Sequence, residues 1–384
     1  MKQRIAIIGA NDFQNQLILK AKEMGYETHV FAWQCGDVGE KTADYFYPIS
    51  IIEKEQILAV CRTIDPVGII SIASDLANIT VNYVAENLGL VCNGIKSTRL
   101  ATNKYAMRKK FEEYGLPSPK SILLQNVEDI NSLEFSYPLI VKPTDRSGSR
   151  GIFKVNKSED FRRAVLRACE ESFEKKVLVE EFVEGREYSV EYISWKGEHH
   201  FLAITKKYTT GAPKFIETRH VQPASDIPEQ IESEIQRLVP RVLDAVGVVY
   251  GASHTELKIT SEGQIKIIEV GARMGGDCIG SDLVKLSTGY DFVRMVIDVA
   301  CGKGPDLSVK RKNGYAMIQF IFDENDLYKL QWIKCHKKEA IRRISEMTEF
   351  DKRVINDSSS RYGYYLLSTD TEEEMSEIIG EING

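Results

Sequence analysis

The sequence predicts a multidomain protein that combines α/β and α+β units and begins with a Rossmann-like unit. Its 384 residues are enough for two to four structural units with apolar cores. Strand and helix patterns alternate over residues 1–95, which indicates a parallel sheet with right-handed crossovers. Strand patterns predominate from about residue 117 to 195, as is typical of a smaller α+β unit.

The bulk composition excludes several classes of function. The net charge of −6 provides no overall positive field that would attract nucleic acid. No run of 18 apolar residues is present, and the apolar start at residues 5–10 is too short for a signal peptide. The seven cysteines form no C-x-x-C pair, which indicates free thiols. We expect a soluble cytoplasmic protein with neither nucleic-acid nor membrane partners.

The first unit has three predicted strands, at 4–10, 26–33 and 67–74, and three helices, at 12–25, 54–65 and 75–89. Its first turn lacks G-x-G-x-x-G, so a dinucleotide site is not indicated. A small-molecule site at the carboxyl ends of the strands would use Ser74 and Asp75. A helix N-cap is the alternative for Asp75.

Two later segments contain polar residues placed for ligand binding. In 139–155, Lys142 ends an apolar strand, and the turn from Ser147 to Gly151 could direct backbone N–H groups toward an anion. An ordinary hairpin with a solvated lysine is the alternative. In 177–193, Phe182, the Val183 backbone and Glu180 could bind an adenine ring, and Glu187 a ribose. A charged hairpin edge is the alternative there.

Residues 254–273, HTELKITSEGQIKIIEVGAR, predict a β-hairpin that brings two glutamates together. Side chains alternate between the faces of a strand, so Glu256 and Glu269 can project from the same side of adjacent strands. Two carboxylates about 4 Å apart repel by roughly 1–4 kcal/mol, so a cation is expected between them. His254 lies two residues before Glu256 on the same face, although a lone histidine is more often structural.

These segments, in this order and spacing, resemble the ATP-grasp superfamily. The resemblance also covers the Rossmann-like unit, Asn103-Lys104 at the start of a helix over 103–115, and the C-terminal segment. It is strongest to carboxylate–amine ligases of the L-amino acid ligase type. It is weaker to carbamoyl phosphate synthetase, D-alanine–D-alanine ligase and biotin carboxylase. The implied units are a Rossmann-like domain (1–95), linker helices with a lid (96–195), a catalytic subdomain with the metal site (196–305) and a C-terminal subdomain (306–384).

The resemblance implies a role for each candidate residue. ATP phosphates would be contacted by Lys104 and Lys142, under a mobile loop that includes Ser147, Gly148, Ser149 and Gly151. The adenine edge would be read by Glu180 and Val183, with Phe182 beside the ring and Glu187 on the ribose. Mg²⁺ (or Mn²⁺) would bind Glu256 and Glu269, and Arg273 would hold an acyl phosphate. His220 would orient substrate or accept a proton. The alternative for His220 is a structural role, and the alternative for Arg273 is a structural salt bridge.

The implied function is an ATP-dependent ligase that joins a small-molecule carboxylate to an amine through an acyl phosphate, and the implied assembly is a homodimer. One departure concerns Gly271, where many members of the superfamily have an asparagine that completes the second metal site. This motivates one alternative, a protein that binds ATP without turnover. The other alternative is a carboxylase-like enzyme that phosphorylates bicarbonate. His199 and His200 are expected in a solvated turn.

Overall fold

The computed structural model describes residues 2–124, 136–308, 314–351 and 354–383, and its N-terminal unit is built around a parallel sheet. The strand order is β3-β2-β1-β4. The strands are β1 (Arg4–Ile8), β2 (Glu27–Phe31), β3 (Tyr45–Tyr47) and β4 (Gly68–Ile70). The helices are α1 (Asp12–Glu23), α2 (Val38–Thr42), α3 (Lys54–Ile64) and α4 (Asp75–Leu88). The Rossmann-like prediction is confirmed, since every strand pair in this sheet is parallel.

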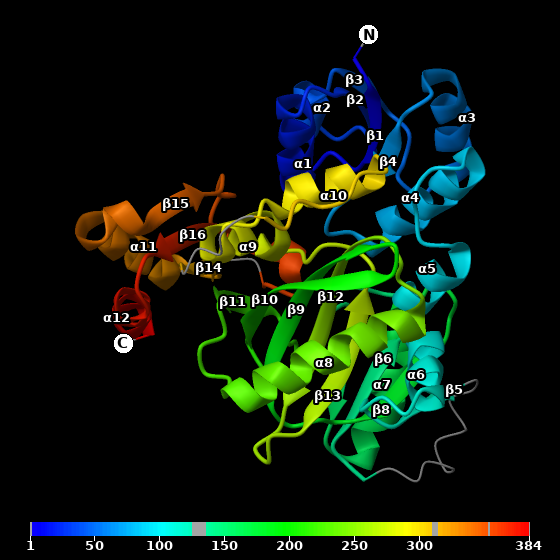
Figure 1. The fold of residues 1–384 in the computed structure, drawn as a ribbon. Helices are drawn as coiled ribbons and strands as arrows, with labels where there is room; N and C mark the ends of the chain where they lie inside the picture. Colours follow the sequence, from blue (N-terminus) through cyan, green and yellow to red (C-terminus); the bar gives the residue numbers. More distant parts are fainter. Residues whose placement is uncertain (1, 125–135, 309–313, 352–353, 384) are drawn as a thin grey trace.

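A four-stranded antiparallel sheet forms the lid beside the central body (Figure 1). Its order is β5-β8-β6-β7, with β5 (Ser121–Leu124), β6 (Leu139–Pro143), β7 (Phe153–Val155) and β8 (Val177–Glu181). Helix α7 (Ser158–Glu171) packs its apolar face on this sheet through Phe161, Val165 and Ala168. Two helices connect the lid to the N-terminal unit, α5 (Ile95–Thr102) and α6 (Lys104–Glu113).

An eight-stranded antiparallel sheet forms the body of the molecule, in the order β13-β12-β9-β10-β11-β14-β16-β15. The strands are β9 (Arg186–Trp195), β10 (Glu198–Thr209), β11 (Glu217–Gln222), β12 (Gly251–Ile259), β13 (Ile265–Gly271), β14 (Tyr315–Ile321), β15 (Ile341–Ile344) and β16 (Gly363–Thr369). The expected lid unit ends at residue 195, but β9 pairs with β10 and β12, so it belongs to this larger sheet. The position of β9 between β10 and β12 brings residues of the central sheet close to the lid.

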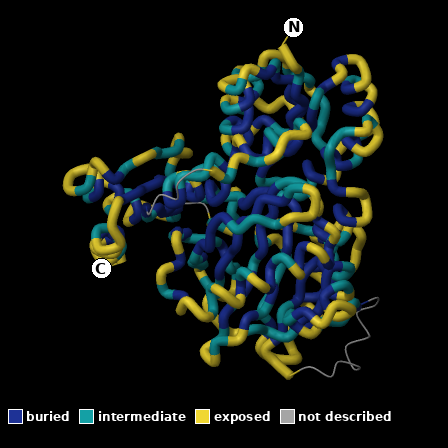
Figure 2. The backbone as a smooth tube through the Cα atoms, viewed as in Figure 1, coloured by how far each residue is buried: buried dark blue, intermediate teal, exposed yellow. Residues whose placement is uncertain are grey.

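The two faces of this sheet differ in chemistry. Helices α6 and α8 (Glu229–Val246) cover one face, where Tyr188, Val190 and Tyr192 join their apolar core. Glu187, Ser189 and Glu191 alternate with them and project from the opposite face, as the strand pattern predicts. On this face Glu191 is buried and Glu187 is partly exposed, within a central body whose tube in Figure 2 has long buried stretches.

The last part of the chain extends the same sheet through β14, β15 and β16. Helices α11 (Glu324–His336) and α12 (Glu372–Asn383) cover these strands with a core of their own. Helices α9 (Val284–Thr288) and α10 (Phe292–Ala300) precede them. Helix α10 packs on the N-terminal sheet, so the segment expected as the catalytic subdomain also completes the core of the first unit.

Three predictions about local features have clear outcomes. His199 and His200 lie in β10 and not in a turn, and the side chain of His199 is buried between Ser194 and Asp244, so the solvated-turn prediction is wrong. The turn is at Lys196 and Gly197. All seven cysteines are free, as expected. No helix in the four described ranges is long and apolar enough to cross a membrane.

Asn93 joins the N-terminal unit to the central sheet. Its buried side chain accepts hydrogen bonds from the backbone N–H groups of Val249 (2.8 Å) and Tyr250 (3.0 Å) and donates one to the Tyr250 carbonyl (2.8 Å). We predict that Asn93→Ala lowers the free energy of unfolding by about 2–4 kcal/mol, because it leaves buried backbone groups without partners. Urea denaturation measures this, with Asn87→Ala on the exposed face of α4 as the control. Equal effects of the two substitutions would contradict this account.

Candidate active site

Two adjoining cavities lie where the lid meets the polar face of the central sheet. The first, which we call the lid cavity, has a volume of about 120 Å³. The second, the loop cavity, has a volume of about 80 Å³. Both are lined by Ser149, Ile152, Glu217, Glu256 and Glu269.

The structure brings together almost all of the residues singled out by sequence. Those on the lid cavity are Lys142, Ser149, Glu180, Phe182, Val183, Glu187, Glu256 and Glu269. Those on the loop cavity are Lys104, Ser147, Gly148, Ser149, Glu256, Glu269 and Arg273. Gly151 and His220 line neither cavity.

The two glutamates of the hairpin lie directly opposite each other. Glu256 on β12 pairs with Glu269 on β13 in the strand register, which confirms the predicted juxtaposition. Each carboxylate meets a lysine: Nζ of Lys207 lies 2.5 Å from Glu256, and Nζ of Lys104 lies 2.6 Å from Glu269. Lysine side chains therefore provide the positive charge that the pair requires.

These carboxylates suit a hard cation that takes its other ligands from elsewhere. Mg²⁺ commonly binds one or two carboxylates together with phosphate oxygens. The described ranges contain no group of three or more histidine, cysteine, aspartate or glutamate side chains able to hold a metal. Glu256 and Glu269 are a carboxylate pair of the kind that Mg²⁺ uses together with phosphate oxygens, and metal binding here stays a prediction.

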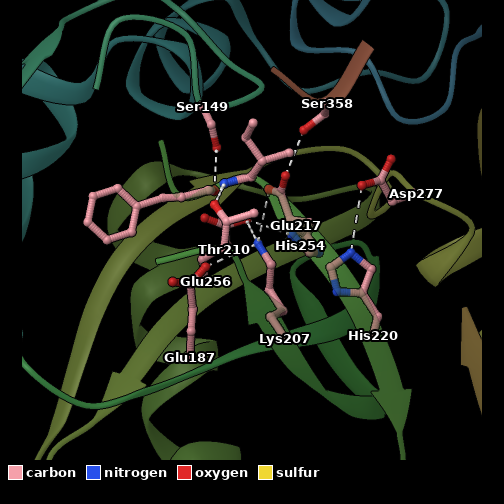
Figure 3. A network of polar contacts seen from close by, with 12 residues as sticks. Ser149, Glu187, Lys207, Thr210, Glu217, His220, His254, Glu256, Asp277 and Ser358 are labelled. Carbon is pink, nitrogen blue, oxygen red and sulfur yellow. Dashed lines mark hydrogen bonds and ion pairs between the residues drawn. The ribbon is translucent and has the colours of Figure 1, made fainter. Parts of the chain in front are cut away.

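Lys207 on β10 is a site residue that the sequence reasoning missed. Its buried ammonium lies 2.5 Å from Glu256, 3.3 Å from Glu187 and 4.0 Å from Glu217 (Figure 3). Burial alone would lower the pKa of Lys207, but the carboxylates raise it above its ordinary value. Burial likewise opposes ionisation of Glu256, but Lys207 and His254 hold its pKa well below the ordinary value. Lys207 and Glu256 are therefore both charged at neutral pH.

Lys142 and Glu180 form a second buried charge cluster with Arg108 of α6. Glu180 lies 2.7 Å from Lys142 Nζ and 2.7 Å from Arg108 Nε. Burial lowers the pKa of Lys142, and Arg108 and Lys142 together outweigh burial to lower that of Glu180. Lys142 is thus a buried residue facing the lid cavity and not a solvated strand lysine. The carboxylate of Glu180 holds the two cations at the cavity wall.

The residues expected around an adenine ring surround the lid cavity together. Lys154 lies 3.7 Å above the ring of Phe182, and Lys258 lies 5.2 Å from it. The carbonyl of Val183 accepts a 3.3 Å hydrogen bond from Lys258. Phe182, Val183, Glu180 and Glu187 thus line one cavity, and Lys258 lies beside both the Phe182 ring and the Val183 carbonyl.

The loop after β6 has the backbone conformation that its glycines allow. Gly148, Ser149 and Gly151 all have positive φ, at 68°, 58° and 70°. A side chain at Gly151 would lie 2.9 Å from Pro143 and 3.0 Å from Glu171, so only glycine fits there. Gly151 therefore shapes the loop from behind, while Ser147, Gly148 and Ser149 face the loop cavity.

Arg273 connects the central sheet to the N-terminal unit. Its guanidinium pairs with Asp75 through Nε (2.9 Å) and Nη2 (3.2 Å) and also lines the loop cavity. Asp75 is therefore an ion-pair partner, whereas Ser74 caps α4. A Cβ atom at Gly271 would lie 3.0 Å from Cζ of Arg273, so glycine at this position leaves room for the guanidinium. An asparagine there would require Arg273 to move.

The two histidines of interest occupy different environments. His254 lines the loop cavity, where its ring contacts Glu191 through Nδ1 and lies 3.3 Å from Glu256 through Nε2. His220 is buried beside Phe320, with Nε2 3.7 Å from Asp277 (Figure 3). Arg361 pairs with both oxygens of Asp277. His220 therefore belongs to a buried cluster beside the cavities, and a direct catalytic contact stays a prediction.

We predict that Lys207→Met lowers the free energy of unfolding by about 3–5 kcal/mol, because it leaves buried carboxylates without their cation. The measurement is chemical denaturation at pH 7 with a metal chelator present. Lys206→Met is the matched control. The neighbouring Lys206 pairs with the less buried Asp226, so this variant should lose less of the free energy of unfolding. A Lys207→Met variant as stable as the wild type would refute the charge balance described here.

We also predict that acidification below about pH 6.5 destabilises the wild type more than it does His220→Gln. Burial lowers the pKa of His220 despite the nearby Asp277. A histidine with a lowered pKa binds fewer protons folded than unfolded, so folding stability falls as pH drops through the unfolded pKa. Denaturation midpoints from pH 7.5 to 5 test this, with the exposed His336→Gln as control. A stability difference that does not vary with pH would contradict it.

Comparisons with known proteins identify a domain within this chain and relatives of similar sequence. Residues 135–282 match the model of an ATP-grasp domain. An alanine–anticapsin ligase of Bacillus subtilis strain 168 is 27% identical over 308 residues, covering 71% of this chain and 64% of the relative. The alignment with that relative therefore spans less than two thirds of its length.

Solved structures extend the fold similarity to the whole described chain. An L-amino acid ligase from Bacillus licheniformis superposes with a TM-score of 0.84 at 23% identity, covering 100% of this chain and 97% of that one. A second solved structure is the biotin carboxylase domain dimer of a Hydrogenobacter thermophilus 2-oxoglutarate carboxylase, in complex with MgADP, ADP and bicarbonate. It superposes with a TM-score of 0.79 at 18% identity, covering 100% of this chain and 89% of that one. The chain therefore contains an ATP-grasp domain, at residues 135–282, and has the ATP-grasp fold over its described length.

Proposed function

We propose that this protein is an ATP-dependent carboxylate–amine ligase that releases ADP and phosphate. The observation that carries the proposal is the opposed pair Glu256 and Glu269 at two adjoining cavities, with Lys104, Lys142 and Arg273 around them. This arrangement suits the binding of a polyphosphate with a divalent cation. The relative named alanine–anticapsin ligase supports amide formation as the reaction class.

The chain's own residues would divide the work between the two cavities. The lid cavity would bind the nucleoside, with Phe182 beside the base and Glu187 on the ribose. Lys104 and Lys142 would hold the phosphates at the junction with the loop cavity. Glu256 and Glu269 would hold Mg²⁺ or Mn²⁺, which neutralises phosphate charge when bound. The neighbour solved with MgADP supports this nucleotide and metal.

The proposed reaction has two steps that balance without a protein nucleophile. A carboxylate oxygen of the first substrate attacks the γ-phosphorus, the bond to the bridging oxygen of ADP breaks, and an acyl phosphate forms. The amine nitrogen of the second substrate then attacks the acyl carbon, phosphate leaves, and the nitrogen loses a proton. Arg273 would orient the acyl phosphate, because its guanidinium presents several donors toward phosphate oxygens.

Gly271 does not by itself favour a protein that only binds ATP. The space left by this glycine is used by the Arg273 guanidinium, which gives the position a structural reason unrelated to turnover. A carboxylase-like reaction is the second candidate, because one structural neighbour was solved with bicarbonate. The two candidates differ in which carboxylate stimulates ADP release.

We predict ADP release from Mg-ATP that depends on a particular carboxylate–amine pair and is accompanied by phosphate and an amide mass. Amino acids are offered singly and in pairs, with bicarbonate as a separate arm. Glu269→Gln should reduce the rate by about a hundredfold or more, since it removes charge at the phosphates. Glu262→Gln, at the exposed turn of the same hairpin, is the control and should stay close to wild type. ADP release driven by bicarbonate alone would replace the ligase with the carboxylase.

A further inference from the structure

A third and larger cavity, of about 350 Å³, lies between the N-terminal unit and the lid. We call it the helix cavity, because α4 and α5 form much of its wall; the connection after β6 and residues 173–174 complete it. Its volume falls within the range of small-molecule pockets. Lys104 and Glu269 at one end of it have roles proposed above, but its apolar residues have none.

The wall formed by the helices has an apolar part, which lies beside polar residues of α5 that include Thr98, Arg99 and Thr102. Leu76, Ile79 and Tyr83 follow one face of α4, and Ile95 of α5 and Phe173 of the lid extend the same surface. Ile79, Ile95 and Phe173 remain 38%, 53% and 62% exposed. Apolar side chains gathered around a cavity and left accessible are typical of a site that binds an apolar group.

The inner end of the helix cavity is charged and adjoins the reaction centre. Lys104, Arg146, Ser147 and Glu269 line both the helix cavity and the loop cavity. Glu269 already pairs with Lys104, and Asp75 already pairs with Arg273. The carboxylates of Glu269 and Asp75 are thus paired with existing cations, and Arg146 adds a further positive charge at this end, as Arg99 does elsewhere on the wall.

Arg146 is held in place but incompletely partnered. Its guanidinium lies 4.4 Å from the ring of Phe173, and Nη2 is a distant 3.5 Å from Glu171. The adjacent Asp145 accepts hydrogen bonds from the backbone N–H groups of Phe173 (3.2 Å) and Glu174 (2.7 Å), which anchors this part of the loop. Nε of Arg146 is buried without a hydrogen-bond partner among the described residues. A buried charged donor of this kind calls for an acceptor, and a carboxylate oxygen is a strong one.

We propose that the helix cavity binds the apolar substituent of the carboxylate substrate, with the carboxylate at the Arg146–Lys104 end. The inference rests on the proposed function and narrows its substrate class. The first substrate would be an acid with a large, uncharged, mainly apolar substituent, such as an aromatic or branched chain. Arg146 is then a specificity-determining residue, and Ile79 contacts the substituent.

The test is calorimetric binding of acetate and 3-phenylpropionate to the full chain in the presence of MgADP. We expect 3-phenylpropionate to bind at least about tenfold more tightly, since its larger apolar surface is removed from water. Ile79→Trp fills the cavity and should weaken 3-phenylpropionate by about tenfold or more, with MgADP affinity unchanged. Leu19→Trp is the matched control, because Leu19 is 47% exposed on α1 and lies outside the lining of the helix cavity.

A second variant separates the charged end from the apolar wall. Arg146→Met should weaken both carboxylates, while the affinity of uncharged 3-phenylpropanamide should change little. Equal affinities for acetate and 3-phenylpropionate, or equal 3-phenylpropionate binding by wild type and Ile79→Trp, would overturn this inference. The proposed ligase would survive that result if MgADP binds and amide formation is observed. A wild-type chain that fails to bind MgADP would overturn both.

Discussion

Four glutamates, Glu187, Glu217, Glu256 and Glu269, face a common pair of cavities, and their mutual repulsion has to be offset for this part of the molecule to fold. Lys207 lies among three of them, and Lys104 pairs with the fourth. The two lysines offset part of the charge of the four carboxylates before any ligand enters. A divalent cation that enters with a phosphate ligand would offset the carboxylate charge that remains.

The same requirement explains why distant parts of the chain converge at the site. The N-terminal unit provides Asp75, which neutralises Arg273, and the linker helix α6 provides Lys104 and Arg108. The C-terminal segment contributes Ser358, whose hydroxyl donates to Glu217 at 2.6 Å (Figure 3). The same segment contributes Arg361, which donates to the Glu217 carbonyl at 3.2 Å. Each segment provides a partner for a charge on the central sheet, so the units are joined through the site itself.

Burial of these charges also limits which residues can fit. Gly271 packs against the Arg273 guanidinium. Gly275 packs as tightly against other side chains, since a Cβ there would lie 2.8 Å from Glu191 and 2.8 Å from His254. The backbone of Gly275 donates to Glu191, which in turn contacts His254 beside Glu256. Small residues therefore let the loop after β13 approach the polar face closely enough to satisfy its carboxylates.

The sequence alone determined the features that depend on neighbouring residues. The alternation in 254–273 and its turn were sufficient to place Glu256 and Glu269 on adjacent strands of one hairpin, because these patterns are local. The register shift between Glu256 and Leu257, which the structure revealed, sets the two carboxylates opposite each other. The Rossmann-like first unit and the strands carrying Lys142 and Glu180 follow from periodicity for the same reason. Only the tertiary structure decided that Lys207 and Glu217 join the site, that Asp75 pairs with Arg273, and that β9 leaves the lid for the central sheet. These contacts join residues far apart in the chain, and burial and charge pairing select them only once the units are packed together.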